Sequence, residues 1–305
     1  MRWTDLSLVC PECRAPLHLE EPDRFECSRG HSYPVVDGIP RFVAAEAYAQ
    51  SFGFEWTRHS RTQVDSLSGR TDSHDTFAAK IGLGRAQLDG KLVLDVGVGS
   101  GRFAEVAADH GARVVGIDLS RAVLAAAENL GDRALIAQAD LFRLPFADGT
   151  FDVVYSIGVL HHTPDTAAAV RAVAALVKPG GTLAIWVYHR APWYRMSDLY
   201  RHLTTRLSNR TLYRLSEVLA GLYPLQRLPV IGRPLRFLVP VSQQADREWR
   251  VLDTFDWYAP RYQWKHTEGE VIGWFRDLGF ESTEVLGIPV AVRGRRPARL
   301  GAQVE

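Results

Sequence analysis

The stretch that decides the fold is "LVLDVGVGSGRFAEVA", residues 92–107. A short, mainly apolar run gives way to Gly97, Gly99 and Gly101, and an alanine-rich amphipathic stretch follows. Glycines cost backbone entropy and add nothing to a core. A strand that turns into a helix through such a loop offers bare backbone and helix N-terminal amides to a nucleotide-bearing ligand. The stretch therefore predicts a βα unit with a nucleotide-type site.

Strands and helices alternate along the chain from this loop onward. Apolar, β-branched runs predict strands at residues 92–96, 113–117, 134–137, 151–157 and 182–188. Between them, helices are expected at 102–110, 120–130 and 165–177, the last ended by Pro179-Gly180-Gly181. This alternation is typical of a parallel sheet that is buried on both faces and binds ligands at the carboxyl ends of its strands. The expected fold class is α/β, with a Rossmann-like, mostly parallel sheet.

Composition limits the classes of function that are open. The chain has 305 residues and a formal net charge of +1, which argues against a polyanion binder by bulk charge. Its basic residues are four lysines and 32 arginines, a bias that first suggests a GC-rich coding sequence. No apolar run approaches the length of a membrane span, so no integral membrane segment is expected. The first residues lack the apolar core of a signal peptide, and the expected location is the cytosol.

All three cysteines lie near the start of the chain, in the pattern C-x2-C-x13-C-x3-H. An odd number of cysteines in a reducing compartment argues against disulfides. Closely spaced pairs suit a tetrahedral zinc ion, and a four-ligand site is more often structural than catalytic. The alternative is three free cysteines beside a surface histidine. We expect a zinc ribbon over residues 1–45, with the ligands Cys10, Cys13, Cys27 and His31.

Acidic residues follow the first three predicted strands or lie within them. Asp118 comes 21 residues after Gly97, where an acid can reach ribose hydroxyls. Asp140 follows the third strand, and Asp95 precedes the glycines. The dinucleotide fingerprint G-x-G-x-x-G is not met, because residue 102 is Arg. The pattern G-x-G-x-G therefore points away from NAD and toward another nucleoside.

Four motifs in order resemble those of class I S-adenosylmethionine-dependent methyltransferases with a type 11-like core. They are "VLDVGVGSGR", "VVGIDLS", "AQADLFRLPFADGTFDVVYSIGVLHHTPD" and "LVKPGGTLAIWVY", and the resemblance extends over residues 90–190 and again over 267–293 as a closing helix and antiparallel hairpin. It implies a seven-stranded sheet and S-adenosyl-L-methionine as cofactor. The cofactor-binding residues that it implies are Asp95, Gly97, Gly99 and Gly101 for methionine, Asp118 and Leu119 for ribose, Asp140 and Leu141 for adenine, and Ile157 and Gly158 beside the sulfonium.

Histidines follow the fourth and fifth predicted strands, at the expected mouth of the site. Methyl transfer to a hydroxyl benefits from a general base. His161 is the preferred candidate, with His162 beside it and His189 as a rival. The alternative is that such histidines cap a helix or pack beside the cofactor. Replacement of His161 by Ala would distinguish these roles. If His161 is the general base, the replacement should abolish turnover and leave cofactor binding intact.

Residues 191–266 form an insertion that we expect to be a helical lid. Residues 190–250 hold 11 arginines against four acidic residues, and leucines recur at helical spacing. The lid could cover an extended or partly apolar substrate, contact a membrane or an anionic chain, or be a packed subdomain or homodimer face. Aromatic residues and carboxylates, Asp253 and Asp256 among them, crowd its last part. This part predicts a substrate wall, suited to a sugar ring, of Trp257, Tyr258, Arg261, Tyr262 and His266.

The chain is thus expected to divide into a ribbon (1–45), a linker or helical arm (46–75), a cofactor-binding core (76–190), the lid (191–266) and closing elements with a tail (267–305). The first functional hypothesis is methylation of a small-molecule acceptor such as a sugar, polysaccharide precursor or natural product, with oxygen as the expected acceptor atom. A ribosomal RNA base methyltransferase is the second, because the cysteine pattern resembles the ribbon of 23S ribosomal RNA guanine-N1 methyltransferases. The segment "YPVVDGIPRF" instead resembles the small tRNA-methyltransferase-activator type of zinc domain. A non-catalytic cofactor-binding partner protein is the third.

Overall fold

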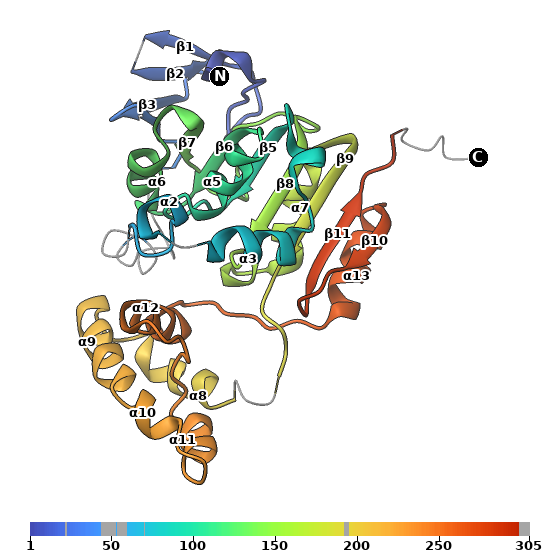
Figure 1. The fold of residues 1–305 in the computed structure, drawn as a ribbon. Helices are drawn as coiled ribbons and strands as arrows, with labels where there is room; N and C mark the ends of the chain where they lie inside the picture. The colour runs from blue at the N-terminus through green and yellow to red at the C-terminus, as the bar shows by residue number, and fades with distance from the viewer. Residues whose placement is uncertain (22, 44–52, 54–59, 70, 192–194, 299–305) are drawn as a thin grey trace.

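The structure is a computed structural model that describes residues 1–21, 23–43, 53, 60–69, 71–191 and 195–298. Figure 1 shows three parts: a small sheet at the N-terminus, a large central sheet with helices on its faces, and a helical lid beyond one end of the large sheet. The Rossmann-like fold expected from the sequence is confirmed. Much of the expected linker or helical arm, residues 46–52 and 54–59, lies outside the described residues, as does the tail from residue 299.

The large sheet has seven strands in the order β10-β11-β9-β8-β5-β6-β7. The parallel strands β5 to β9 form the centre and one edge, and the antiparallel pair β10 and β11 forms the other edge. The connection from β7 to β8 crosses the sheet, so β5 lies at the switch point where ligands bind in open α/β sheets. The strands are β5 Leu92–Val96, β6 Arg113–Asp118, β7 Ala134–Gln138, β8 Phe151–Ile157, β9 Val177–Trp186, β10 Glu281–Val285 and β11 Ala291–Arg295.

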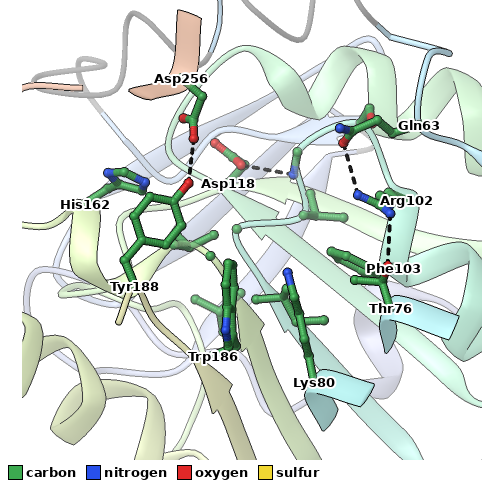
Figure 2. Close-up of a pocket in the computed structure, with 18 of the residues that line it drawn as sticks. Gln63, Thr76, Lys80, Arg102, Phe103, Asp118, His162, Trp186, Tyr188 and Asp256 are labelled. Atoms are coloured by element: carbon green, nitrogen blue, oxygen red, sulfur yellow. Dashed lines mark hydrogen bonds between the residues drawn. The ribbon is translucent and has the colours of Figure 1, made fainter. Parts of the chain in front are cut away.

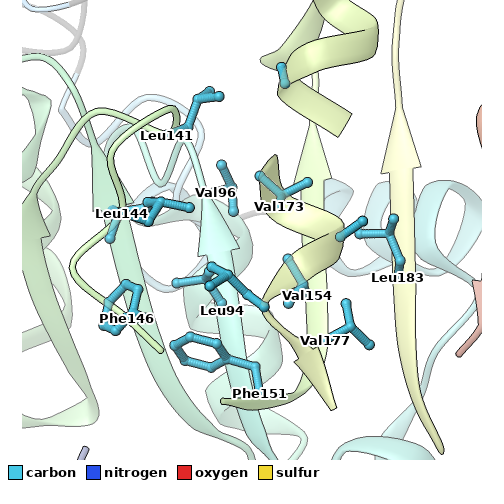
Figure 3. Packing of buried hydrophobic residues seen from close by; sticks show 14 of the residues in the cluster. Leu94, Val96, Leu141, Leu144, Phe146, Phe151, Val154, Val173, Val177 and Leu183 are labelled. Atoms are coloured by element: carbon cyan, nitrogen blue, oxygen red, sulfur yellow. The ribbon is translucent and has the colours of Figure 1, made fainter. Parts of the chain in front are cut away.

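Helices cover both faces of this sheet, as the apolar strands predict. On one face, α7 and α13 pack with Leu94 and Val154 (Figure 3), and on the other face α3, α5 and α6 pack with Val93 and Val153. Alternate residues of each strand thus join different clusters, which buries both faces. The helices are α3 Asp72–Ile81, α5 Arg102–Asp109, α6 Ala122–Leu130, α7 Thr166–Ala175 and α13 Glu268–Asp277, with shorter turns at α2 Asp65–Ser68, α4 Arg85–Leu88, η2 Gly131–Arg133 and η3 Leu160–His162.

The Pro-Gly-Gly segment differs from the expectation. Helix α7 ends at Ala175, and residues 179–181 lie inside β9 rather than at a helix end. A Cβ on Gly181 would lie 2.8 Å from the carbonyl oxygen of Asp152 on the neighbouring strand. The glycine therefore permits a close approach of β8 and β9, a role that the sequence alone does not separate from that of a helix stop.

The small N-terminal sheet has four antiparallel strands, after a turn at η1 Trp3–Asp5. It packs against the large sheet near β7 and the loop before β8. Phe42 donates its backbone N–H to Gln138 on β7, and Arg14 donates side-chain hydrogen bonds to the carbonyls of Leu144 and Phe146. Phe25 and Cys10 belong to the same apolar cluster as Leu94. The strands are β1 Leu17–Glu21, β2 Arg24–Cys27, β3 Ser32–Val36 and β4 Ile39–Pro40.

The lid insertion is helical. Its helices are α8 Arg195–Thr204, α9 Asn209–Ala220, α10 Tyr223–Gln226, α11 Gly232–Leu238 and α12 Arg247–Tyr258. Leu212, Tyr213, Val251 and Phe255 form part of a separate core between α9 and α12. The two chain segments that connect the lid to the sheet run side by side: His266 donates its backbone N–H to the carbonyl of Tyr188, and Arg190 donates its own to the carbonyl of His266. Within the described residues, no helix has the length and apolar character needed to cross a bilayer.

Candidate active site

A cavity of about 620 Å³ lies at the carboxyl ends of the parallel strands, between the sheet and the lid (Figure 2). Loops after β5, β6, β7, β8 and β9 form its floor, and α3 and α12 supply further walls. This volume is within the range of roughly 300–1,000 Å³ that is usual for small-molecule sites. The position is the one expected for an open α/β sheet with a switch point at β5.

The glycine loop at the end of β5 forms part of this cavity. Gly97 has a φ of +84°, and a Cβ there would lie 2.3 Å from the Val159 side chain. Any larger residue would therefore push the loop away from the loop that follows β8. Gly97 and Gly99 line the cavity and lead into α5, which begins at Arg102. The loop thus brings bare backbone and a helix N-terminus to the cavity wall, as the sequence predicts.

Asp118 at the end of β6 also lines the cavity. One carboxylate oxygen accepts a hydrogen bond from the backbone N–H of Gly99 at 3.1 Å, and the other accepts from the N–H and the hydroxyl of Ser120. These bonds fix the carboxylate beside the glycine loop. Burial raises the pKa of Asp118, and the hydrogen bonds from Ser120 and Gly99 oppose that shift.

Most of the predicted cofactor residues meet at this wall. Besides Gly97, Gly99 and Asp118, the lining includes Leu119, Leu141, Ile157 and Gly158. Three other predicted residues are not part of it. Asp95 is 3% exposed and accepts a hydrogen bond from the Tyr155 hydroxyl, Gly101 abuts Leu130 of α6, and the Asp140 carboxylate accepts from the backbone N–H of Phe142. These three residues shape the loops from behind.

Asp95 places a carboxyl group in the buried interior of a strand, which is unusual. Burial raises the pKa of its carboxyl to about 7, while the hydrogen bond from Tyr155 opposes the shift. The phenol belongs to the neighbouring strand β8, opposite Asp95 in the parallel register. The pair therefore links β5 to β8 directly beneath the glycine loop.

Aromatic side chains form the opposite wall. Trp186 and Tyr188 follow one another at the end of β9, with ring centroids 5.4 Å apart. The Tyr188 hydroxyl donates a 2.7 Å hydrogen bond to Asp256 of α12 (Figure 2). This bond joins the sheet to the lid across the cavity. Trp257 of α12 and His189 complete the ring-rich side.

The two adjacent histidines have different surroundings, and the sequence-based preference for His161 is not supported by this geometry. His161 is completely buried, lies outside the cavity lining, and stacks between His162 and Tyr188 at centroid distances of 4.1 and 4.0 Å. Neither of its ring nitrogens has a hydrogen-bond partner among the described residues. Burial lowers its pKa well below the usual value, so the ring is neutral packing material.

His162 lines the cavity. Its Nδ1 lies 2.8 Å from the backbone carbonyl of Tyr262. A carbonyl only accepts, so Nδ1 carries the proton and Nε2 of the neutral ring carries the lone pair. Burial lowers the pKa of His162, and the nearby Arg201 and Lys265 act in the same direction against Asp256. The ring is therefore neutral near pH 7 and able to accept a proton.

The predicted substrate wall is only partly present at the cavity. Trp257 lines it, together with Asp253 one turn earlier and Asp256 directly before it on α12. The other four predicted residues lie elsewhere. Tyr258 is buried and donates to the carbonyl of Pro240, Tyr262 supplies the carbonyl to His162, His266 contacts Thr166 and Trp274, and Arg261 lies over the Tyr262 ring.

Two basic residues were not predicted from the sequence and lie at the cavity. Lys80 of α3 lies 3.3 Å from the centroid of the Trp186 ring, and burial with the nearby Arg102 lowers its pKa to about 7. Arg102 is held by Ser73 and Gln63. Arg102 could have been found because it directly follows the glycine loop. For Lys80 the only signal is that lysine is rare in this chain.

The cysteine cluster lies far from this cavity, in the small sheet. The ligand atoms of Cys10, Cys13, Cys27 and His31 all lie within 4.8 Å of one another. The Cys13 and Cys27 sulfurs are 3.7 Å apart, close to the edge of about 3.8 Å expected for tetrahedral zinc with bonds of about 2.3 Å. Burial opposes ionisation of Cys10, but hydrogen bonds to Tyr33 and to the backbone of Cys13 and Glu12 lower its pKa to about 6. The donor set fits a structural zinc ion.

Residues 94–185 match the family described as "Methyltransferase domain". The ubiquinone biosynthesis O-methyltransferase of Pseudomonas paraeruginosa is 40% identical over 116 residues, which are 35% of this chain and 49% of that protein. The protein of the same name from Ralstonia nicotianae is 44% identical over 113 residues, 34% of this chain and 46% of that protein. The chain spans about half the length of the curated relatives it matches.

Two solved structures contain chains that are similar to this one. A chain of the complex between the Haloferax volcanii Trm112 methyltransferase activator and a methyltransferase is 17% identical, with a TM-score of 0.48, and covers 81% of this chain and 98% of its own. Magnesium protoporphyrin IX methyltransferase of Synechocystis, with bound SAH, is 19% identical, with a TM-score of 0.45, and covers 82% and 97%.

The family match begins inside β5 and ends inside β9, so it covers the glycine loop, Asp118, the loop after β7 and His162. The sheet has the seven, mostly parallel strands that the motif resemblance implies, with an antiparallel pair at one edge. The ribbon and the lid lie outside the matched residues. Residues 94–185 of this chain therefore form a methyltransferase domain of that family.

Proposed function

We propose that this protein transfers a methyl group from S-adenosylmethionine to a hydroxyl oxygen of a small-molecule acceptor. The observation that carries the proposal is the single cavity with two unlike walls. One wall holds the glycine loop and Asp118 of the methyltransferase domain, and the other holds Trp186, Tyr188 and the lid helix α12. A donor and an acceptor bound against these walls would meet near Gly158.

The residues of the first wall suit S-adenosylmethionine. The backbone of Gly97 to Gly99 would contact the methionine part, and the Asp118 carboxylate would accept hydrogen bonds from ribose hydroxyls. Leu119, Ala139 and Leu141 offer an apolar border for adenine. When bound, the cofactor supplies a methyl group on a sulfonium leaving group. The chain itself aligns the two reactants and keeps water out.

The second wall suits a small acceptor with an apolar or ring-shaped body. Trp186, Tyr188 and Trp257 provide flat faces, and Asp253 and Asp256 provide polar groups beside them. Burial raises the pKa of Asp253 to about 7, so near neutral pH this carboxyl both donates and accepts hydrogen bonds. Sugars and natural products with free hydroxyls have this combination of features. The names of the relatives, which are O-methyltransferases, support transfer to oxygen.

His162 is the general base in this proposal. Its Nδ1–H is held by the carbonyl of Tyr262, which orients the ring and places the lone pair on Nε2. With an acceptor hydroxyl placed beside the ring, Nε2 would take the hydroxyl proton, so that the acceptor oxygen could receive the methyl group. The lowered pKa keeps the base neutral before the reaction.

A labelled-methyl assay with the purified full chain tests the proposal. Tritiated S-adenosylmethionine would be incubated with cell extract separated into RNA, saccharide, lipid and small-molecule fractions, each with and without RNase. The variant D118A is the matched control, because it removes the ribose contact and should lower incorporation about tenfold or more at limiting cofactor. RNase-insensitive label in a saccharide, lipid or small-molecule fraction, sensitive to D118A, is the expected result.

Other outcomes would overturn it. Label in RNA that disappears with RNase would favour an RNA base methyltransferase whose ribbon recognises the substrate. Binding of S-adenosylhomocysteine with no incorporation in any fraction would favour a non-catalytic cofactor-binding protein.

A further inference from the structure

Large apolar side chains are unusually exposed on the outer helices of the lid. The described residues include 19 exposed large hydrophobic side chains, and 11 of them lie between residues 199 and 238. Val230 is 84% exposed, Val218 71% and Leu203 68%. The full set, here called the lid outer surface, is Leu199, Leu203, Leu207, Leu215, Val218, Leu225, Leu228, Val230, Ile231, Phe237 and Leu238. Exposed apolar groups at this density are typical of an interaction surface.

These side chains are not simply the unfilled core of the lid. The lid has its own apolar cluster between α9 and α12, which includes Leu212 and Phe255. Helix α12 directs Trp257 and Asp256 to the cavity, whereas α10 and α11 lie at the end of the lid farthest from the sheet (Figure 1). None of the 11 residues of the lid outer surface lines the cavity, and they belong to a folded unit with a core of its own.

Basic residues share the same segment. Residues 195–238 contain eight arginines, no lysine and two acidic residues, a net charge of +6 in a chain whose total is +1. Six of these arginines are exposed, and one of the two acids, Asp198, bonds to Lys265. On α9, Arg210, Arg214 and Val218 recur every four residues and form one exposed stripe. The exposed arginines are Arg206, Arg210, Arg214, Arg227, Arg233 and Arg236.

We propose that the lid outer surface docks on an anionic phospholipid membrane. Arginines interleaved with aliphatic side chains on short helices match a bilayer interface, where the cations meet lipid phosphates and the aliphatic groups enter the acyl boundary. The exposed side chains of Val230 and Ile231 would be transferred from water into the acyl region of the bilayer, which is favourable for apolar groups. RNA is a poorer match because it is recognised by stacking on aromatic rings, and Phe237 is the only aromatic residue among the 11.

A second copy of the chain is also a poorer match. A self-complementary interface would bring two sets of six exposed arginines together, with only Asp198 and Glu217 in residues 195–238 to offset them. Docking would leave the cavity side of α12 facing the sheet, so the inference does not depend on methyl transfer and is tested without turnover.

Vesicle co-sedimentation with the full chain tests this inference. Binding to vesicles of phosphatidylglycerol and phosphatidylcholine would be compared with binding to phosphatidylcholine alone, at low and high salt. We expect the anionic vesicles to bind about tenfold or more tightly, with affinity that falls as salt rises. The variant L203Q/V230Q should weaken binding about tenfold or more, because it removes two apolar insertions. The variant R210Q/R214Q should remove much of the lipid-charge preference.

The matched control is I272Q/V285Q, which changes two apolar residues that are 36% and 38% exposed on α13 and β10. It should bind vesicles as the unchanged protein does. Circular dichroism melts of all variants show whether the lid is still folded. Absence of binding, equal binding to both vesicle types, or equal loss in the control would overturn the inference. Light scattering that shows a dimer broken by L203Q/V230Q would assign the surface to a second copy, and displacement of vesicles by RNA would assign it to RNA.

Discussion

At the scale of single residues, His162 and its neighbour His161 differ in what they touch and therefore in what their loss should do. The variant H162Q removes the proton acceptor at the cavity, and we expect turnover to fall by about 10²- to 10⁴-fold. Binding of S-adenosylhomocysteine, measured by calorimetry, should change little because the His162 ring packs against Tyr188 of the aromatic wall, at a centroid distance of 5.5 Å. The variant H161L replaces a buried ring that makes no side-chain hydrogen bond within the described residues. It should lower turnover by less than about tenfold. The reverse order of effects would restore His161 as the base.

The pH dependence of turnover belongs to the same residue. His162 accepts a proton only when it is neutral, and burial lowers its pKa below the ordinary value of about 6.5. Activity should therefore be constant above about pH 7 and should be lost as the pH falls through this lowered pKa. The measurement is the pH profile of kcat/KM for the unchanged protein and for K80M. The pKa of Lys80 is lowered to about 7. An inflection near that pH which disappears in K80M would make Lys80 the base.

At the scale of elements, helix α12 connects the lid to the acceptor side of the cavity. We propose that its Trp257, which lines the cavity, contacts the acceptor, so W257A should raise the acceptor KM about tenfold or more. The affinity for S-adenosylhomocysteine should stay within about twofold of that of the unchanged protein, since the substitution removes a contact to the acceptor and none to the cofactor. R247A changes an exposed residue at the start of the same helix and is the control. A larger effect on cofactor affinity than on KM would place the donor, not the acceptor, against α12.

The strands and the walls of the cavity differ in how well the sequence predicts them. The strand Leu92–Val96 was predictable to the residue, because an apolar run bounded by glycine has only one reading in an alternating chain. The position of Gly97 and Asp118 at the cavity was predictable, because each lies at the carboxyl end of a strand that the local sequence pattern predicts. The proposed acceptor wall was not, since Tyr262 and His266 follow the cavity residue Trp257 within ten residues but are hydrogen-bonded to η3 and α7 instead. Lys80 reaches the cavity only through the packing of α3 on β9, which no local pattern encodes.

At the scale of the whole molecule, the ribbon and the sheet share one apolar cluster, so metal loss should affect more than the ribbon. Elemental analysis should find one zinc ion per chain, and C13S should lose it. We expect this variant to melt roughly 5 °C or more below the unchanged protein, because the ion holds a small domain that buries Phe25 and Cys10 against the core. S28A, beside a ligand but exposed, is the control. If C13S lost zinc and melted at the same temperature, the ribbon would be stable without metal.

The paired connections of the lid have a consequence for how such a chain can change. Because Tyr188 and Arg190 are hydrogen-bonded to His266, the two ends of the lid insertion are held side by side at the sheet. A different insertion between these two ends would therefore close its loop at small entropic cost. The lid is in this sense a cassette. A chain built this way could acquire a new acceptor by replacement of the insertion alone, while residues 94–185 stay unchanged.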